Sequence, residues 1–160
     1  MWKIAILTSS DRGAAGERED TSGRFLRESV KELGTLMDQK ILPDDEETLV
    51  SQLQSWVDQG IDLILTTGGT GLGPRDNMPE ATRRIMTREV VGMSEALRDE
   101  SRKHTPMGML SRNVCAQAHD TLIINFPGSL PAVRQLFPVV FPVLDHALSL
   151  IHGMTEHKNS

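Results

Sequence analysis

The stretch "IDLILTTGGTGLGPRD", residues 61–76, decides how this chain is organised. Its first half is a short apolar run with the length of a buried strand. Its second half places four glycines and a proline before an arginine and an aspartate. Glycine is costly in regular structure, and it is favoured where the backbone takes a positive φ or approaches a ligand closely. The stretch therefore predicts a strand that leaves the core through a specialised loop.

Strands and helices alternate on both sides of this stretch. Apolar runs predict strands at 3–9, 35–42 (a weak one), 61–67 and from 120 into a Gly/Pro turn ending at 129. Helical patterns occupy 21–34, 43–60, 79–89, 92–104 and 130–153. This alternation predicts an α/β fold, with a mainly parallel sheet covered by helices on both faces.

The last helical region contains Pro138 and Pro142. A proline deep in a helix removes a backbone hydrogen bond and clashes with the preceding turn. We therefore expect two consecutive helices here, with a break before Pro138.

Length and composition predict one compact domain. The chain has 160 residues, of which 38% are hydrophobic and 24% charged, which is ordinary for a globular protein able to bury a core. We expect a single domain over residues 1–153 and a flexible tail over 154–160.

The composition also argues against several classes of protein. A net charge of -5 and the absence of tyrosine disfavour a nucleic-acid binder. The sequence contains no apolar run long enough to span a bilayer, so no membrane partner is expected. The single cysteine, Cys115, allows no internal disulfide and suits a reducing compartment. A cytoplasmic location is the expectation.

Three polar segments follow predicted strands directly: "SSDRGAAGERED" (9–20), "TTGGTGLGPRD" (66–76) and "NFPGS" (125–129). In open parallel sheets, ligands bind beyond the carboxyl ends of the strands. The three segments are therefore expected to converge on one binding site.

The glycine-rich loop has two interpretations. Successive N–H groups of Gly68, Gly69, Gly71 and Gly73 can form an anion-binding nest, with hydroxyl donors from Thr67 and Thr70. The loop matches neither the P-loop pattern nor the dinucleotide-binding pattern. The alternative is a mobile turn with no ligand.

Asp76 favours the binding interpretation. A carboxylate beside a phosphate repels it unless a cation lies between them, so Asp76 indicates Mg²⁺ held jointly by carboxylate and phosphate oxygens. The alternative is that Asp76 caps the helix that follows.

Four blocks together resemble a known family. "TTGGTG" followed by "RDNMPEAT", with "SSDR…G…DTSG", "LPDD" and "NFPGSLPAV", is similar to the molybdopterin adenylyltransferases of molybdenum cofactor biosynthesis, which include MogA and MoaB. The blocks occur in family order, and the similarity runs from Lys3 to Gly153.

The resemblance implies an enzyme with a three-layer α/β/α sandwich, assembled as a homotrimer or a hexamer. Its activity would be Mg²⁺- and ATP-dependent transfer of AMP to the terminal phosphate of molybdopterin, with release of pyrophosphate. The product would pass to a molybdate-inserting partner. Two other functions stay open: a non-catalytic molybdopterin-binding scaffold, and nucleotide pyrophosphate hydrolysis on the same fold.

The resemblance also implies site residues. Asp44 and Asp76 are the expected catalytic acids and Mg²⁺ ligands, although Asp45 competes with Asp44 on local sequence. The expected substrate and nucleotide contacts lie in the three loops and one further segment: Ser10, Asp11, Asp20, Ser22, Gly23, Thr67, Gly68, Gly69, Thr70, Gly71, Arg112, Gly128 and Ser129.

One position departs from the family pattern. The family usually has Thr or Ser before Pro-Glu-Ala, where a hydroxyl would cap the next helix, and this chain has Met78. Asn77 or Asp76 is then expected to supply the cap, which would weaken the assignment of Asp76 to a metal.

Overall fold

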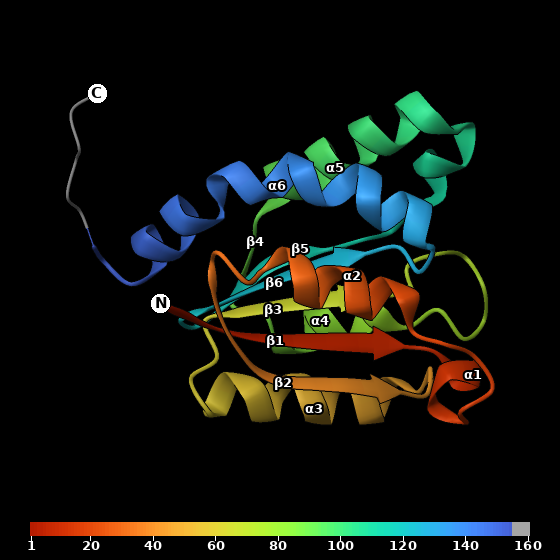
Figure 1. The fold of residues 1–160 in the computed structure, drawn as a ribbon, viewed down its shortest axis with the longest axis horizontal. Coiled ribbons are helices and arrows are strands. Elements are labelled where there is room, and N and C mark those ends of the chain that lie inside the picture. Colours follow the sequence, from red (N-terminus) through yellow and green to blue (C-terminus); the bar gives the residue numbers. More distant parts are fainter. Residues whose placement is uncertain (155–160) are drawn as a thin grey trace.

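The fold is known from a computed structural model, which describes residues 1–154 (Figure 1). The tail expected at 154–160 lies, from residue 155 onward, outside the described residues. No helix within the described part of the chain is long and apolar enough to cross a membrane.

One six-stranded sheet forms the centre of the molecule, in the order β2-β1-β3-β6-β5-β4. Strands β2, β1, β3 and β6 are parallel, and β5 runs antiparallel to both of its neighbours. The prediction of a mainly parallel sheet is confirmed. The strands are β1 (Trp2–Ser9), β2 (Gly34–Leu42), β3 (Leu63–Thr67), β4 (Arg88–Glu89), β5 (Cys115–Ala118) and β6 (Thr121–Phe126).

Helices cover both faces of the sheet (Figure 1). Helices α2, α5 and α6 pack on one face, and α3 and α4 on the other. The helical elements are α1 (Asp11–Ala14), α2 (Thr21–Ser29), α3 (Glu46–Asp58), α4 (Met78–Ile85), α5 (Val91–His104), the 3₁₀ helix η1 (Pro106–Leu110) and α6 (Leu130–Ile151).

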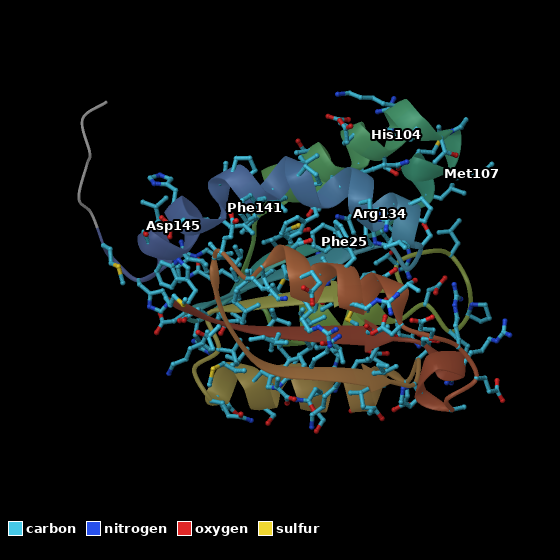
Figure 2. All side chains as sticks on the ribbon, viewed as in Figure 1. Phe25, His104, Met107, Arg134, Phe141 and Asp145 are labelled. Carbon is cyan, nitrogen blue, oxygen red and sulfur yellow. The ribbon has the colours of Figure 1, made fainter. Side chains whose placement is uncertain are left out.

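Side-chain alternation in β1 supplies both cores. Ile4 and Ile6 belong to the core under α2, α5 and α6, whereas Ala5 and Leu7 belong to the core under α3 and α4. Within the first of these helical layers, Arg134 of α6 lies over the ring of Phe25 of α2, with its guanidinium carbon 5.9 Å from the ring centre (Figure 2). The predicted three-layer sandwich is therefore confirmed.

The predicted break before Pro138 is wrong, because α6 continues from Leu130 to Ile151 through both prolines. Pro138 and Pro142 are exposed and lie one turn apart, so the carbonyl groups that lose their N–H partners face water. The opposite face buries Leu136, Val140 and Leu144, among other apolar residues. This burial stabilises the continuous helix despite the missing hydrogen bonds.

The register brings three strand ends together. Thr8 of β1 is paired with Thr67 of β3, which in turn is paired with Phe126 of β6. The loops that follow these residues therefore leave the sheet side by side, as the sequence predicts.

Candidate functional site

The glycine-rich loop begins with two residues in the left-handed region, Gly68 (φ +93°) and Gly69 (φ +71°). A Cβ on Gly68 would lie 2.4 Å from the carbonyl oxygen of Ser9, which ends β1. Glycine at position 68 is therefore required both by its backbone conformation and by the close approach of the first loop.

The four-donor nest expected from the glycines is not formed in full. The N–H of Gly68 donates to the carbonyl oxygen of Phe126, and the N–H of Gly73 donates to Asp76 Oδ2 at 2.9 Å. The N–H groups of Gly69 and Gly71 have no acceptor in the part of the chain that the structure describes. An anion at the loop would thus have two backbone donors from these glycines.

Asp76 does not cap α4. Its carboxylate folds back over its own loop, where Oδ2 accepts from the N–H of Gly73. The capping position is Asn77, and its side chain makes no capping bond; its Nδ2 instead donates to the carbonyl oxygen of Asp44. Met78 is fully buried in the core under α3 and α4. Met78, the residue that departs from the family pattern, therefore fills the core, and Asp76 does not act as the cap in its place.

Asp44 and Asp45 differ clearly in their surroundings. Asp45 is the N-cap of α3, where its carboxylate accepts from both the N–H and the hydroxyl of Thr48. These hydrogen bonds hold the pKa of Asp45 below its usual value. Asp44 instead faces the first loop, and its carboxylate accepts from the Ser9 hydroxyl and from the N–H of Asp11. The geometry thus gives Asp45 a helix-capping role and leaves Asp44 beside the loops.

Asp11 is bound to the glycine-rich loop by an ion pair. Arg75 donates to both of its oxygens, at 3.0 and 2.8 Å, and lowers the pKa of Asp11. The same carboxylate accepts from the N–H of Asp44. Asp11 and Arg75 therefore join the first loop, the loop before α3 and the glycine-rich loop.

The remaining first-loop residues are held by local hydrogen bonds. Asp20 caps α2, accepting from the N–H of Gly23 at 2.9 Å and from the Thr8 hydroxyl at 2.7 Å. A Cβ at position 23 would lie 2.1 Å from the Asp20 carboxylate, so only glycine fits there. Ser22 donates to the carbonyl oxygen of Gly128 at 2.7 Å, which ties the first loop to the last.

Hydroxyl side chains fix the ends of the loops in a similar way. Ser10 caps α1 and Ser129 caps α6, and each accepts from a backbone N–H three residues on. Thr67 donates to the carbonyl oxygen of Pro127 at 2.7 Å.

These loops enclose a polar pocket of about 230 Å³ at the carboxyl ends of β1 and β3. Most of the residues expected from the first and last loops lie in its wall. The wall consists of Thr8, Ser9, Ser10, Gly13, Arg18, Glu19, Asp20, Thr21, Ser22, Thr67, Gly68, Gly128 and Ser129. The expected convergence of three loops thus produces a hydroxyl-rich pocket.

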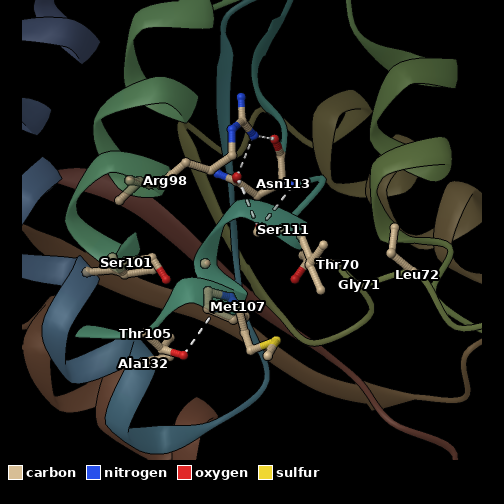
Figure 3. Close-up of a pocket in the computed structure, with 15 residues that line it drawn as sticks. Thr70, Gly71, Leu72, Arg98, Ser101, Thr105, Met107, Ser111, Asn113 and Ala132 are labelled. Carbon is tan, nitrogen blue, oxygen red and sulfur yellow. Dashed lines mark hydrogen bonds between the residues drawn. The ribbon is translucent and has the colours of Figure 1, made fainter. Parts of the chain in front are cut away.

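A second, mainly apolar pocket of about 350 Å³ adjoins the middle of the glycine-rich loop, at Thr70, Gly71 and Leu72 (Figure 3). Its apolar wall includes Leu97, Leu110 and Leu136. Its polar groups include Ser101 of α5, together with Ser111 and Asn113 between η1 and β5 (Figure 3). The sequence did not predict this pocket, because the last turns of α5 look like a solvated helix face. In this region the sequence pointed only to Arg112, which the family resemblance implied as a substrate contact.

The first part of the glycine-rich loop contributes to the walls of both pockets. Thr67 and Gly68 line the polar pocket, and Thr70 and Gly71 line the apolar one. A ligand lying across the loop could therefore place one end in each pocket and pass close to the N–H groups of Gly69 and Gly71.

Comparison with known proteins identifies the family. A family model described as a probable molybdopterin binding domain matches residues 5–146. The chain belongs to the molybdenum cofactor biosynthesis family of MogA and MoaB. It is 35% identical over 154 residues to the molybdopterin adenylyltransferase of Helicobacter pylori strain J99, spanning 94% of this chain and 88% of that protein.

Other relatives of the family are longer than this chain. The Drosophila melanogaster molybdenum cofactor synthesis protein cinnamon is 40% identical over 151 residues, but the chain spans only 25% of that protein. Among solved structures, MoaB from Thermus thermophilus is 45% identical, with a TM-score of 0.88 and coverage of 96% of this chain and 98% of that one. The Mog protein from Mycobacterium ulcerans is 34% identical, with a TM-score of 0.89 over 94% and 99% of the two chains.

The Mg²⁺ that the family resemblance implies would have to be held partly by the ligand itself. Within residues 1–154, no cluster of three or more His, Cys, Asp or Glu side chains is placed to hold a metal. Mg²⁺ is commonly bound by one or two carboxylates together with phosphate oxygens and water, and not by an all-protein cage. Asp44 and Asp76 are the carboxylates that would contribute, and their loops are joined by the hydrogen bond from the Asn77 side chain to the backbone carbonyl oxygen of Asp44.

Proposed function

We propose that this chain is a molybdopterin adenylyltransferase, which transfers AMP from ATP to the terminal phosphate of molybdopterin. The proposal rests mainly on one observation: a polar and an apolar pocket are lined by neighbouring parts of one glycine-rich loop, residues 67–68 and 70–72. The product of the reaction has a nucleoside at one end, a pterin at the other and a pyrophosphate linkage between them. Two pockets that share a loop whose Gly69 and Gly71 N–H groups have no acceptor within residues 1–154 match that arrangement.

The polarity of each pocket suits a different part of the product. The polar pocket offers hydroxyl, carboxylate and backbone groups that suit a nucleotide, and it includes Ser129 at the N-terminus of the long helix α6. The positive end of a helix dipole favours phosphate. The apolar pocket suits the flat pterin ring, and the hydroxyls of Thr70 and Ser101 can fix its orientation.

The chemistry requires two anions to approach each other. An oxygen of the molybdopterin phosphate forms a bond to the α-phosphorus of ATP, the bond between this phosphorus and the α–β bridging oxygen breaks, and pyrophosphate leaves. The protein orients the two substrates in separate pockets and offers the N–H groups of Gly69 and Gly71 to phosphate oxygens. Asp44 and Asp76 would hold Mg²⁺, which when bound neutralises phosphate charge.

The proposal is tested by incubating the protein with ATP, Mg²⁺ and molybdopterin and measuring adenylylated molybdopterin and pyrophosphate. The two other functions give different results. A nucleotide pyrophosphate hydrolase would cleave ADP-ribose-like substrates without a pterin, and a scaffold would bind molybdopterin without turnover.

We expect Gly69→Val to weaken binding of ATP or molybdopterin by about tenfold or more, because a β-branched side chain resists positive φ. The added side chain would also crowd its neighbours, since a Cβ at position 69 would lie 3.3 Å from the Ser9 hydroxyl oxygen and 3.5 Å from the backbone N of Met78. Titration of each ligand, with circular dichroism as a control for folding, measures the effect. Unchanged affinity in a folded variant would return the loop to the mobile-turn interpretation.

We also propose that the chain assembles as a homotrimer or as a hexamer of two trimers, as the family resemblance implies. Large apolar side chains stand exposed at the apolar pocket, among them Leu72, Met107 and Leu110, and exposed apolar groups of this kind commonly mark contact surfaces. Light scattering at micromolar concentration should give a mass that is a multiple of three chains. A monomer would contradict this assembly.

A further inference from the structure

Arg112 lies between η1 and β5 and is bonded to both ends of the second half of the glycine-rich loop. Its Nε donates to the carbonyl oxygen of Gly71 at 2.8 Å, and its Nη2 donates to the carbonyl oxygen of Asp76 at 2.9 Å. Its backbone N–H donates to the carbonyl oxygen of Thr70 at 2.8 Å. One residue therefore fixes the beginning and the end of segment 71–76.

Glu80, in the first turn of α4, orients this arginine. The third guanidinium nitrogen, Nη1, is paired with Glu80 Oε1. Burial raises the pKa of Glu80, but the hydrogen bond from Arg112 and other favourable contacts outweigh it, so the pKa lies below its usual value. The second oxygen, Oε2, is buried without a hydrogen-bond partner among the described residues. Leaving a buried carboxylate oxygen unpaired is unfavourable, and the ion pair with Arg112 offsets that cost.

The segment that Arg112 holds is tightly closed around Asp76. Gly73 exchanges two hydrogen bonds with Asp76, one through its N–H and one through its carbonyl oxygen. Cβ atoms at Gly71 or Gly73 would each lie 2.9 Å from Asp76 Oδ2. The position of this carboxylate therefore depends on the path of the segment, and that path depends on Arg112.

The neighbours of Arg112 in the sequence line the apolar pocket. Ser111 and Asn113 both lie in its wall, and Asn113 is fixed there by Arg98, whose Nη1 lies 2.8 Å from Asn113 Oδ1 (Figure 3). Arg112 thus connects the wall of that pocket to the loop that carries Asp76.

We propose that Arg112, oriented by Glu80, is a positioning residue that fixes segment 71–76 and with it the Asp76 carboxylate, and that it is not a substrate contact. The protein engages three of its five N–H donors, one on each guanidinium nitrogen, and these three bonds fix the plane of the guanidinium against the loop. The expected effect on turnover rests on the proposed adenylyl transfer, whereas the effect on the loop does not.

The test compares Arg112→Lys, Arg112→Gln and Glu80→Gln with the control Arg102→Gln, which alters an exposed arginine of α5 paired with Asp99. Lysine keeps the charge but cannot make the three directed bonds of a guanidinium. We therefore expect both Arg112 variants to speed amide hydrogen exchange at Gly73 and Asp76, measured by NMR, by about tenfold. We expect Glu80→Gln to change exchange in the same direction by less, and the control to leave it unchanged.

Turnover gives the second measurement. Both Arg112 variants should lower kcat by about tenfold or more, with a smaller change in the KM for molybdopterin. Normal exchange and normal kcat in Arg112→Lys, with a raised KM for molybdopterin in Arg112→Gln alone, would identify a substrate contact and overturn the proposal. A third outcome is that the Arg112 variants exchange faster while the unmodified protein transfers no AMP. This outcome would support the positioning role and contradict the proposed function. Glu80→Gln keeps the test decisive if an Arg112 variant fails to fold.

Discussion

Asp76→Asn is expected to lower AMP transfer by at least about a hundredfold, with little change in melting temperature. A cation's stabilisation of transferring phosphoryl oxygens is commonly worth several kcal/mol, and each loss of about 1.4 kcal/mol slows the reaction about tenfold. The substitution is nearly isosteric. An asparagine oxygen can still accept the hydrogen bond that Gly73 donates to Asp76 Oδ2, so the loop should keep its path. What is lost is the negative charge that we propose helps to hold Mg²⁺ against the phosphates.

Steady-state rates and thermal melting of the same preparation measure both halves of this prediction. Asp58→Asn is a suitable control, because Asp58 is an exposed residue at the end of α3 that accepts a hydrogen bond from Gln54. Near-normal turnover in Asp76→Asn would show that the carboxylate serves only to shape its loop. A large fall in melting temperature would show that its main contribution is to stability.

Asp44→Asn is expected to lose at least about tenfold in Mg²⁺-dependent turnover while still binding molybdopterin, because the change removes one of the two carboxylates that we propose hold the ion. Asp45→Asn should change turnover far less. Asp45 accepts from Thr48 as the cap of α3, and asparagine caps a helix about as well as aspartate.

The two variants form a matched pair, since they alter adjacent residues by the same chemical change. Rates measured across a range of Mg²⁺ concentrations separate loss of metal binding from loss of folding. Equal effects in the two variants, or a larger effect from Asp45→Asn, would show that the wrong member of the pair had been assigned to the reaction.

The architecture could be predicted from the sequence because its signals are local. The strand at 61–67 is a continuous apolar run, and the parallel sheet follows from the alternation of such runs with helical patterns. The short strands β4 (Arg88–Glu89) and β5 (Cys115–Ala118) were missed, since neither carries a run of β-branched residues; β5 forms by pairing with β6, and β4 by pairing with β5. Pro138 and Pro142 led to the wrong prediction of a helix break. A helix tolerates such prolines when they lie on its exposed face, and the sequence alone did not show which face of α6 meets water.

The candidate site was predictable where loops follow strands. The polar pocket contains Ser10, Asp20, Gly128 and Ser129, which lie in segments expected to converge after β1 and β6, and Ser22, which the family resemblance implied. The choice between Asp44 and Asp45 was not settled by local sequence. It depends on the first turn of α3, where Asp45 meets Thr48, and on the approach of the first loop to Asp44.

The apolar pocket could not be derived from the sequence. Its wall combines α5, η1, the start of α6 and the glycine-rich loop, and none of these carries a recognisable motif for it. Gly108 illustrates the dependence on packing, because a Cβ there would lie 2.8 Å from the backbone N of Arg102. Contacts of this kind between η1 and α5 follow from the tertiary fold alone.

Isotope transfer follows the proposed movement of AMP from ATP to molybdopterin. The protein is incubated with molybdopterin, Mg²⁺ and ATP labelled either at the α-phosphorus or at the γ-phosphorus. We expect the α label in a molybdopterin product and the γ label in pyrophosphate, and we expect neither product without molybdopterin. Release of α-labelled AMP into solution with no labelled pterin, or binding of molybdopterin without release of pyrophosphate, would contradict the proposed transfer.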